Sequence, residues 1–151
     1  MAWNNLAVQE VLDLWEMEAN CAQATAKGLL QHFGYEEASD VLFNSFFPYG
    51  GGFKERSICG AVSGTLAALS YLGYRKEYSH DEIIALGNAF KEKFQTEFGS
   101  LRCRGILAPF QLPDGEFDMD NPDRRDRCTY AVGLATQMAN TLLTIKNSAN
   151  M

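Results

Sequence analysis

Apolar residues recur every three to four positions along most of the chain, which is the spacing that gives a helix one apolar face. The pattern predicts helical structure over residues 6–33 and a shorter helix over residues 36–46. Ser57 is placed to cap a further helix that runs through Leu72, with Gly73 just past its end. The first half of the chain is therefore expected to be helical.

The second half of the chain continues the same pattern. Ser79 and Glu82 form a capping box, in which two residues satisfy the first backbone N–H groups of a helix reciprocally. The helix that follows is expected to end at Gly99. Its apolar stripe consists of Ile83, Leu86, Phe90, Phe94 and Phe98.

A loop rich in Pro, Asp and Gly separates the last two predicted helices. Ser100 is placed to cap a short helix through Leu107, and residues 109–122 form the loop. Asn121 and Pro122 then supply an N-cap and a first-turn proline for a helix that reaches residue 145. Since strand-like alternation is scarce, the sequence predicts an all-α bundle of about five to seven helices, in one domain over residues 1–151.

The charge of the chain narrows the classes of partner. The 151 residues carry a formal net charge of −6. Because binding to nucleic acid phosphates needs a basic surface, the sequence predicts no nucleic acid partner. An assembly of identical chains stays open.

No segment predicts membrane insertion. Residues 1–14 carry no basic residue ahead of their apolar positions, so they do not resemble a secretory signal. The uncharged run over residues 58–74 is shorter than the roughly 20 residues of a membrane span and carries Ser63, Thr65 and Ser70. We therefore expect a cytoplasmic protein. In that compartment cysteines serve metal or redox chemistry more often than structural disulfides.

Four cysteines, Cys21, Cys59, Cys103 and Cys128, are spread along the chain. None belongs to a C-x-x-C pair, so the local signature of a structural zinc site is absent. Cys21, Cys59 and Cys128 lie on predicted helix faces made of small residues, which let helix backbones approach closely. Such faces permit the cysteines to meet, although free cysteine also packs in cores as a small apolar side chain.

Charge and helix position favour ionised thiols. The predicted caps place Cys59 two residues and Cys103 three residues into their helices, where the helix dipole stabilises anions. Seven of the 13 Lys and Arg residues lie within five residues of three cysteines, and these are Lys54, Arg56, Arg102, Arg104, Arg124, Arg125 and Arg127. The sequence thus predicts lowered thiol pKa values, with Cys59 or Cys103 as the attacking member of a pair.

The order of these features resembles the C_GCAxxG_C_C proteins, a family described as redox-active and named for its cysteine pattern. The resemblance spans nearly the whole chain. It rests on "NCAQA" at 20–24, "GGG" at 50–52, "CGAVSG" at 59–64, "FGSLRCRGIL" at 98–107 and "RCTYAVGLA" at 127–135. It implies that Cys21, Cys59, Cys103 and Cys128 are the functional set.

Two redox chemistries are compatible with this set. The cysteines can exchange between dithiol and disulfide, with a pairing that the sequence does not fix, or they can hold a [2Fe–2S] cluster or another thiophilic metal that transfers or senses electrons. Both require a redox partner whose identity the sequence leaves unknown. The backbone is expected to approach the site at Gly50, Gly51, Gly52, Gly60 and Gly64.

A non-catalytic alternative also stays open. A helical binding module could hold an anion or small ligand near the glycine triplet, with the cysteines merely packed. The phosphate-loop motif G-x-x-x-x-G-K-[ST] is absent, so the triplet does not indicate nucleotide binding.

Overall fold

A computed structural model describes residues 5–149 of the chain and confirms the all-α class. Three short turns, η1 (Phe47–Tyr49), η2 (Gly52–Arg56) and η3 (Ala108–Phe110), accompany the α-helices. The α-helices are α1 (Leu6–Glu16), α2 (Cys21–His32), α3 (Glu36–Ser45), α4 (Gly60–Arg75), α5 (His80–Phe98), α6 (Cys103–Ile106) and α7 (Pro122–Ala149). Among the described residues, no helix is long and apolar enough to span a membrane.

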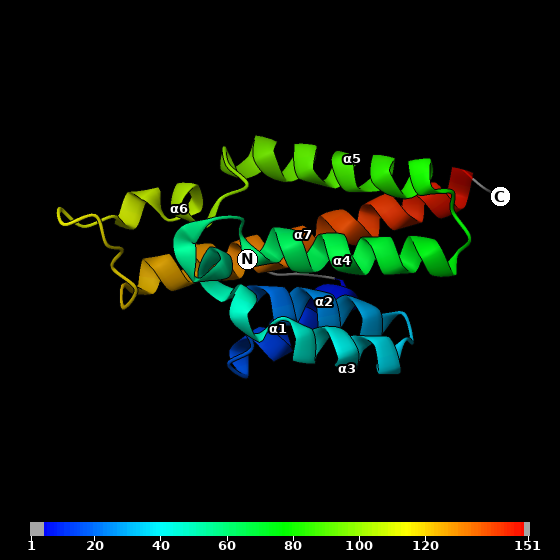
Figure 1. The fold of residues 1–151 in the computed structure, drawn as a ribbon, viewed down its shortest axis with the longest axis horizontal. Coiled ribbons are helices and arrows are strands. Elements are labelled where there is room, and N and C mark those ends of the chain that lie inside the picture. Colours follow the sequence, from blue (N-terminus) through cyan, green and yellow to red (C-terminus); the bar gives the residue numbers. More distant parts are fainter. Residues whose placement is uncertain (1–4, 150–151) are drawn as a thin grey trace.

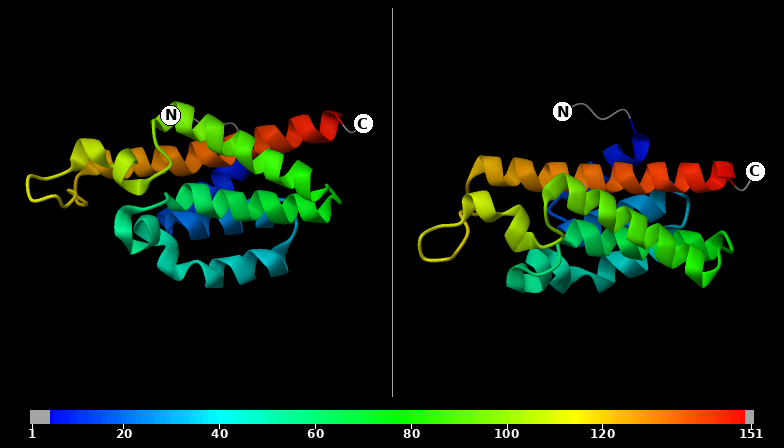
Figure 2. Two further views of the ribbon diagram at one scale, coloured as in Figure 1. Left: turned by 45° about the horizontal axis from the view of Figure 1, so that its top comes forward. Right: turned by 90° about the horizontal axis from the view of Figure 1, so that it is seen from above.

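The long helices run lengthwise beside one another (Figure 1). Helix α2 packs against α1, α3 and α4, while α7 contacts α1, α4 and α5. Short α6 and the loop that follows it lie at the end of the bundle where α4 and α7 begin (Figures 1 and 2). This end therefore gathers several helix N-termini.

The core lies between α2, α4, α5 and α7. In the predicted apolar stripe of α5, Phe90 and Phe94 are fully buried, and Leu86 and Phe98 nearly so. Ile83 is only half-buried. Burial of this stripe confirms the face assigned to α5. Each Å² of apolar surface that it buries stabilises the fold by about 25 cal/mol.

The continuous helical pattern over residues 6–33 is wrong in one respect, because the chain breaks between Glu16 and Cys21. Glu18 adopts a left-handed φ of 71°. Asn20 then starts α2 through a capping box, in which its side chain accepts from the Gln23 N–H at 2.8 Å and its own N–H donates to the Gln23 side chain at 3.0 Å. The apolar spacing hides the break because each of the two helices has buried residues at helical spacing, Val8, Val11 and Trp15 in α1 and Ala22, Ala26 and Leu29 in α2.

The predicted caps of α4 and α6 are also wrong. Cys59, rather than Ser57, is the N-cap of α4, which runs past Gly73 to Arg75. Cys103 is the first residue of α6, and Arg102 precedes it as the N-cap. The cause is tertiary, because an antiparallel bridge pairs the segments just ahead of the two helices and delays both starts.

The remaining helix ends follow local chemistry. The predicted capping box of Ser79 and Glu82 starts α5, and Gly99 ends it with a left-handed φ of 74°. Pro122 begins α7 as predicted, and the Asn121 side chain accepts from the Asp123 N–H at 2.9 Å. Both predictions are confirmed because they depend on residues adjacent in sequence.

The Glu82 carboxylate at the start of α5 makes the stability of the fold depend on pH in the acidic range. Glu82 pairs with Lys146 of α7 and accepts from the Ser79 N–H, and these contacts lower the pKa of Glu82 to about 2 from 4.5. A carboxyl group whose pKa is lower in the folded than in the unfolded state stabilises the fold at pH values above the unfolded-state pKa. This contribution is lost as the pH falls from 4.5 towards 2. We expect the melting temperature, followed by circular dichroism, to fall more steeply over this range in the wild type than in Glu82→Gln.

Glu92→Gln is the matched control for this prediction, since Glu92 is an exposed carboxylate of the same helix. The control should keep the acid dependence of the wild type. Parallel pH curves for wild type and Glu82→Gln would contradict the role assigned to Glu82.

Candidate functional site

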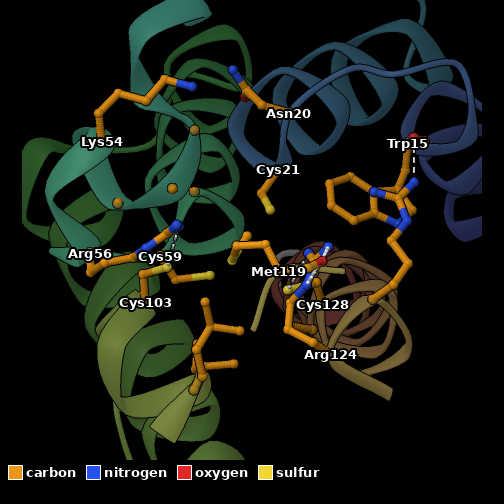
Figure 3. Close-up of a pocket in the computed structure, with 18 of the residues that line it drawn as sticks. Trp15, Asn20, Cys21, Lys54, Arg56, Cys59, Cys103, Met119, Arg124 and Cys128 are labelled. Atoms are coloured by element: carbon orange, nitrogen blue, oxygen red, sulfur yellow. Dashed lines mark hydrogen bonds between the residues drawn. The ribbon is translucent and has the colours of Figure 1, made fainter. Parts of the chain in front are cut away.

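All four cysteines line one cavity of about 270 Å³ at the end of the bundle. Each comes from a different element. Cys21 begins α2, Cys59 caps α4, Cys103 begins α6, and Cys128 lies in the second turn of α7. Figure 3 shows the four side chains around a shared space. Residues separated by up to 107 positions in sequence (21 to 128) thus face one site.

The antiparallel bridge between Ile58 and Arg102 brings the first two thiols together. The Cys59 N–H donates to the Leu101 carbonyl at 2.9 Å, and the Cys103 N–H donates to the Ser57 carbonyl at 2.6 Å. Because side chains alternate across extended backbone, pairing at this bridge directs Cys59 and Cys103 to the same side. The bridge that delays the two helices therefore also builds the site.

A close crossing of α2 and α4 brings Cys21 to the same cavity. A Cβ at Gly60 would lie 2.9 Å from the Cys21 Cβ and 2.8 Å from the Ala22 backbone nitrogen. One turn later, a Cβ at Gly64 would lie 2.8 Å from the Ala22 Cα. Gly60 lines the cavity, whereas Gly64 lies at the crossing behind it.

The glycine triplet forms part of the cavity wall, as Gly50, Gly51 and Gly52 all line it. A Cβ at Gly52 would lie 2.9 Å from the Cys103 Cβ, so only glycine allows this approach. The left-handed conformation of Gly51 and Gly52 continues through residues 53 and 54, at φ values of 60° and 62°. This left-handed turn is costly for residues with side chains, and it ends at Arg56 beside Cys103.

Burial sets the ionisation of the thiols. It raises the pKa of Cys59 to about 12 and that of Cys21 well above its usual value, with Coulombic repulsion from the neighbouring thiols adding to both. Burial also raises the pKa of Cys103, although the hydrogen bond from Arg56 opposes it. The predicted low pKa of Cys59 or Cys103 is therefore wrong, because desolvation outweighs the nearby cations.

Two arginines contact the sulfurs of Cys103 and Cys128, which form the outer pair of thiols. Arg56 Nη1 donates to Cys103 Sγ at 3.8 Å, and Arg124 Nη1 donates to Cys128 Sγ at 3.7 Å. Of the seven cations noted in the sequence, Lys54, Arg56, Arg124 and Arg125 line the cavity. The other three are absent from its wall, and Arg104 and Arg127 instead donate to backbone carbonyls.

Sequence reasoning missed several residues of the cavity wall, among them Trp15 and Met119. Trp15 belongs to the apolar stripe of α1, which gave it the pattern of a core residue. The Arg125 guanidinium lies 3.9 Å from the centre of the Trp15 ring. Met119 lies in a loop without periodicity, so no pattern in the sequence identified it.

Comparison with known protein families identifies the family to which the chain belongs. Over residues 19–142 the sequence matches the family described as "Putative redox-active protein (C_GCAxxG_C_C)". The chain belongs to this family. The matched span contains all four cysteines of the cavity, and membership in the C_GCAxxG_C_C family supports a redox-related role. Comparisons with curated proteins and with solved structures gave no match.

The donor set of this C_GCAxxG_C_C protein can be compared with what metals need. All four cysteines are free thiols, and no histidine lines the cavity. Within residues 5–149, no group of three or more His, Cys, Asp or Glu side chains is arranged to hold a metal ion. A single ion therefore has no preformed site. Four sulfurs around a cavity do match the donor chemistry of a larger thiophilic group held from its wall.

Proposed function

We propose that the four cysteines form one redox centre by acting as ligands of an iron–sulfur cluster, through which the protein transfers or senses electrons. The observation that carries this proposal is that four thiols, supplied by four separate elements, line a single cavity. Dithiol exchange needs only two thiols, whereas cluster ligation uses four.

Ionisation supports ligation over nucleophilic attack for the inner pair, Cys21 and Cys59. Their raised pKa values keep these thiols neutral near pH 7, and a neutral thiol is a poor nucleophile. Several thiolates in one cavity would also repel one another. A metal centre deprotonates its thiol ligands and supplies the positive charge that offsets this repulsion.

The chain's own residues have distinct tasks in this scheme. Cys21 and Cys59 would hold the cluster from the starts of α2 and α4, and Cys103 and Cys128 would hold it from α6 and α7. Apolar residues of the wall, Ile106, Leu107 and Ala131, restrict water at the sulfurs. When bound, an iron–sulfur cluster supplies one-electron transfer at a potential set by such burial and by hydrogen bonds to sulfur.

A second function is favoured by a separate observation on the outer pair. Cys103 and Cys128 are both half-buried, each accepts a hydrogen bond from a guanidinium group, and Cys103 lies within electrostatic range of Cys128. As a dithiol, this pair would lose two protons and pass two electrons to a redox partner when its disulfide forms.

Anaerobic purification and reconstitution with ferrous iron and sulfide test the first function. We expect visible charge-transfer absorption together with stoichiometric iron and sulfide in the same sample. A protein that stays colourless and iron-free after reconstitution would overturn the cluster proposal. Thiol counting before and after a mild oxidant then tests the second function, for which two thiols should be lost. Four unchanged thiols would exclude it.

A further inference from the structure

The loop over residues 111–121 is tied to the site by the same two arginines that contact the outer sulfurs. Arg56 donates to Cys103 Sγ and lies over the Phe117 ring, 5.7 Å from its centre. Arg124 donates to Cys128 Sγ and also to the Met119 carbonyl, with its Nε at 3.1 Å. Each outer sulfur is thus linked through one guanidinium group to the 111–121 loop.

One residue of this loop forms part of the cavity wall. Met119 lines the cavity, and Figure 3 places it next to Cys128 and Arg124. The other polar contacts of the loop are local in sequence, such as the Gln111 side chain to the Gly115 carbonyl at 3.1 Å and the Asp118 N–H to the Phe110 carbonyl at 2.8 Å. The two arginines are the side chains that connect this loop to the sulfurs of Cys103 and Cys128.

Neither arginine is neutralised by a carboxylate. In the described part of the chain, ion pairs form at Lys27 with Asp40, His32 with Glu10 and Lys146 with Glu82, and none involves Arg56 or Arg124. Arg125 and Arg127 are likewise half-buried, so what sets Arg56 and Arg124 apart is that each donates a hydrogen bond to a cysteine sulfur. The groups they do face are sulfurs, which become their counter-charge when they ligate metal.

We propose that Arg56 and Arg124 are positioning residues that compensate negative charge on Cys103 and Cys128 and, through the same contacts, hold the 111–121 loop and its Met119 against the site. The inference deepens the proposed function, and only its electrostatic half rests on that function. A hydrogen bond to a charged sulfur is stronger than one to a neutral thiol, so the loop should be held more tightly when the sulfurs carry charge.

Substitution separates this role from simple packing. Arg56→Gln and Arg124→Gln remove the charge, whereas Arg124→Lys keeps the charge and loses the planar fork that reaches sulfur and carbonyl together. Arg102→Gln is the matched control, because Arg102 is an exposed arginine next to Cys103 that does not line the cavity. Far-ultraviolet circular dichroism checks that each variant keeps its helices.

Hydrogen exchange of the 111–121 loop, measured by mass spectrometry on the metal-free reduced protein, is the first readout. We expect about tenfold or faster exchange in Arg56→Gln and Arg124→Gln, and no change in Arg102→Gln. Equal exchange in all of these proteins would overturn the proposal. Because no cluster is needed, this result stands whether or not the protein takes up iron.

The midpoint reduction potential of the reconstituted protein is the second readout. Removing a cation from a ligating sulfur destabilises the more negative, reduced state, so both glutamine variants should shift the potential downwards. Arg124→Lys should keep the wild-type potential more closely while its loop exchanges faster. Unshifted potentials in both glutamine variants would overturn the electrostatic role. Failure of the wild type to take up iron would instead count against the proposed function alone.

Discussion

Replacing any one of the four cysteines by serine is expected to abolish iron and sulfide uptake. Each cysteine comes from a different element of the cavity wall, and the chain has no fifth cysteine to replace a lost thiolate ligand. Serine keeps the shape of the side chain but removes the soft thiolate that binds iron. We therefore expect at least about a tenfold loss of bound iron in each single variant after anaerobic reconstitution.

Met119→Leu is the matched control for this series. Met119 presents the other sulfur of the same wall, but its thioether is not among the four proposed ligands. Iron content should stay at the wild-type level in this variant. Wild-type iron content in any single cysteine variant would contradict ligation by all four cysteines.

Stability must be measured beside iron content. Cys59 is buried, and a hydroxyl placed there without a partner costs about 1–3 kcal/mol. Cys103 and Cys128 are half-buried, so serine at these positions should cost less. Metal-free variants that melt close to the wild type and yet take up no iron would show that ligation, rather than folding, was lost.

The features predicted from sequence are those with local causes. The capping box at Ser79, the left-handed Gly99 and the first-turn Pro122 each depend on contacts within a few residues, and all three are confirmed. The small residues around Cys59 likewise indicated a close helix approach, and Gly60 lies against Cys21 as such an approach requires.

The features that sequence reasoning missed have tertiary causes. The starts of α4 and α6 depend on a bridge between Ile58 and Arg102, residues 44 positions apart (58 to 102). The thiol pKa values depend on desolvation, which a count of neighbouring cations cannot show. The pairing of Arg56 with Cys103 required the left-handed turn of residues 51–54, which no motif indicated.

The helix crossing beneath the site gives the second large effect, through Gly64→Ala. A Cβ at Gly64 would lie 2.8 Å from the Ala22 Cα and would also overlap the Ala22 carbonyl and the Thr25 hydroxyl. Backbone atoms cannot rotate away, so α2 must move from α4. We expect a cost of about 3 kcal/mol from this overpacking, offset by about 1 kcal/mol of helix propensity.

Gly87→Ala provides the comparison that isolates the overpacking. Its Cβ would meet only Leu66 Cδ2, at 3.3 Å, which is the end of a flexible side chain. Both variants gain the same helix propensity. In chemical denaturation, the free energy of unfolding of Gly64→Ala should therefore be lower than that of Gly87→Ala by at least about 2 kcal/mol. Since Cys21 begins the helix that must move, iron uptake should also fall in Gly64→Ala and not in Gly87→Ala. Equal stability of the two variants would contradict this prediction. It would mean that the helix crossing accommodates the added Cβ without displacing α2, so that the position of Cys21 does not depend on Gly64.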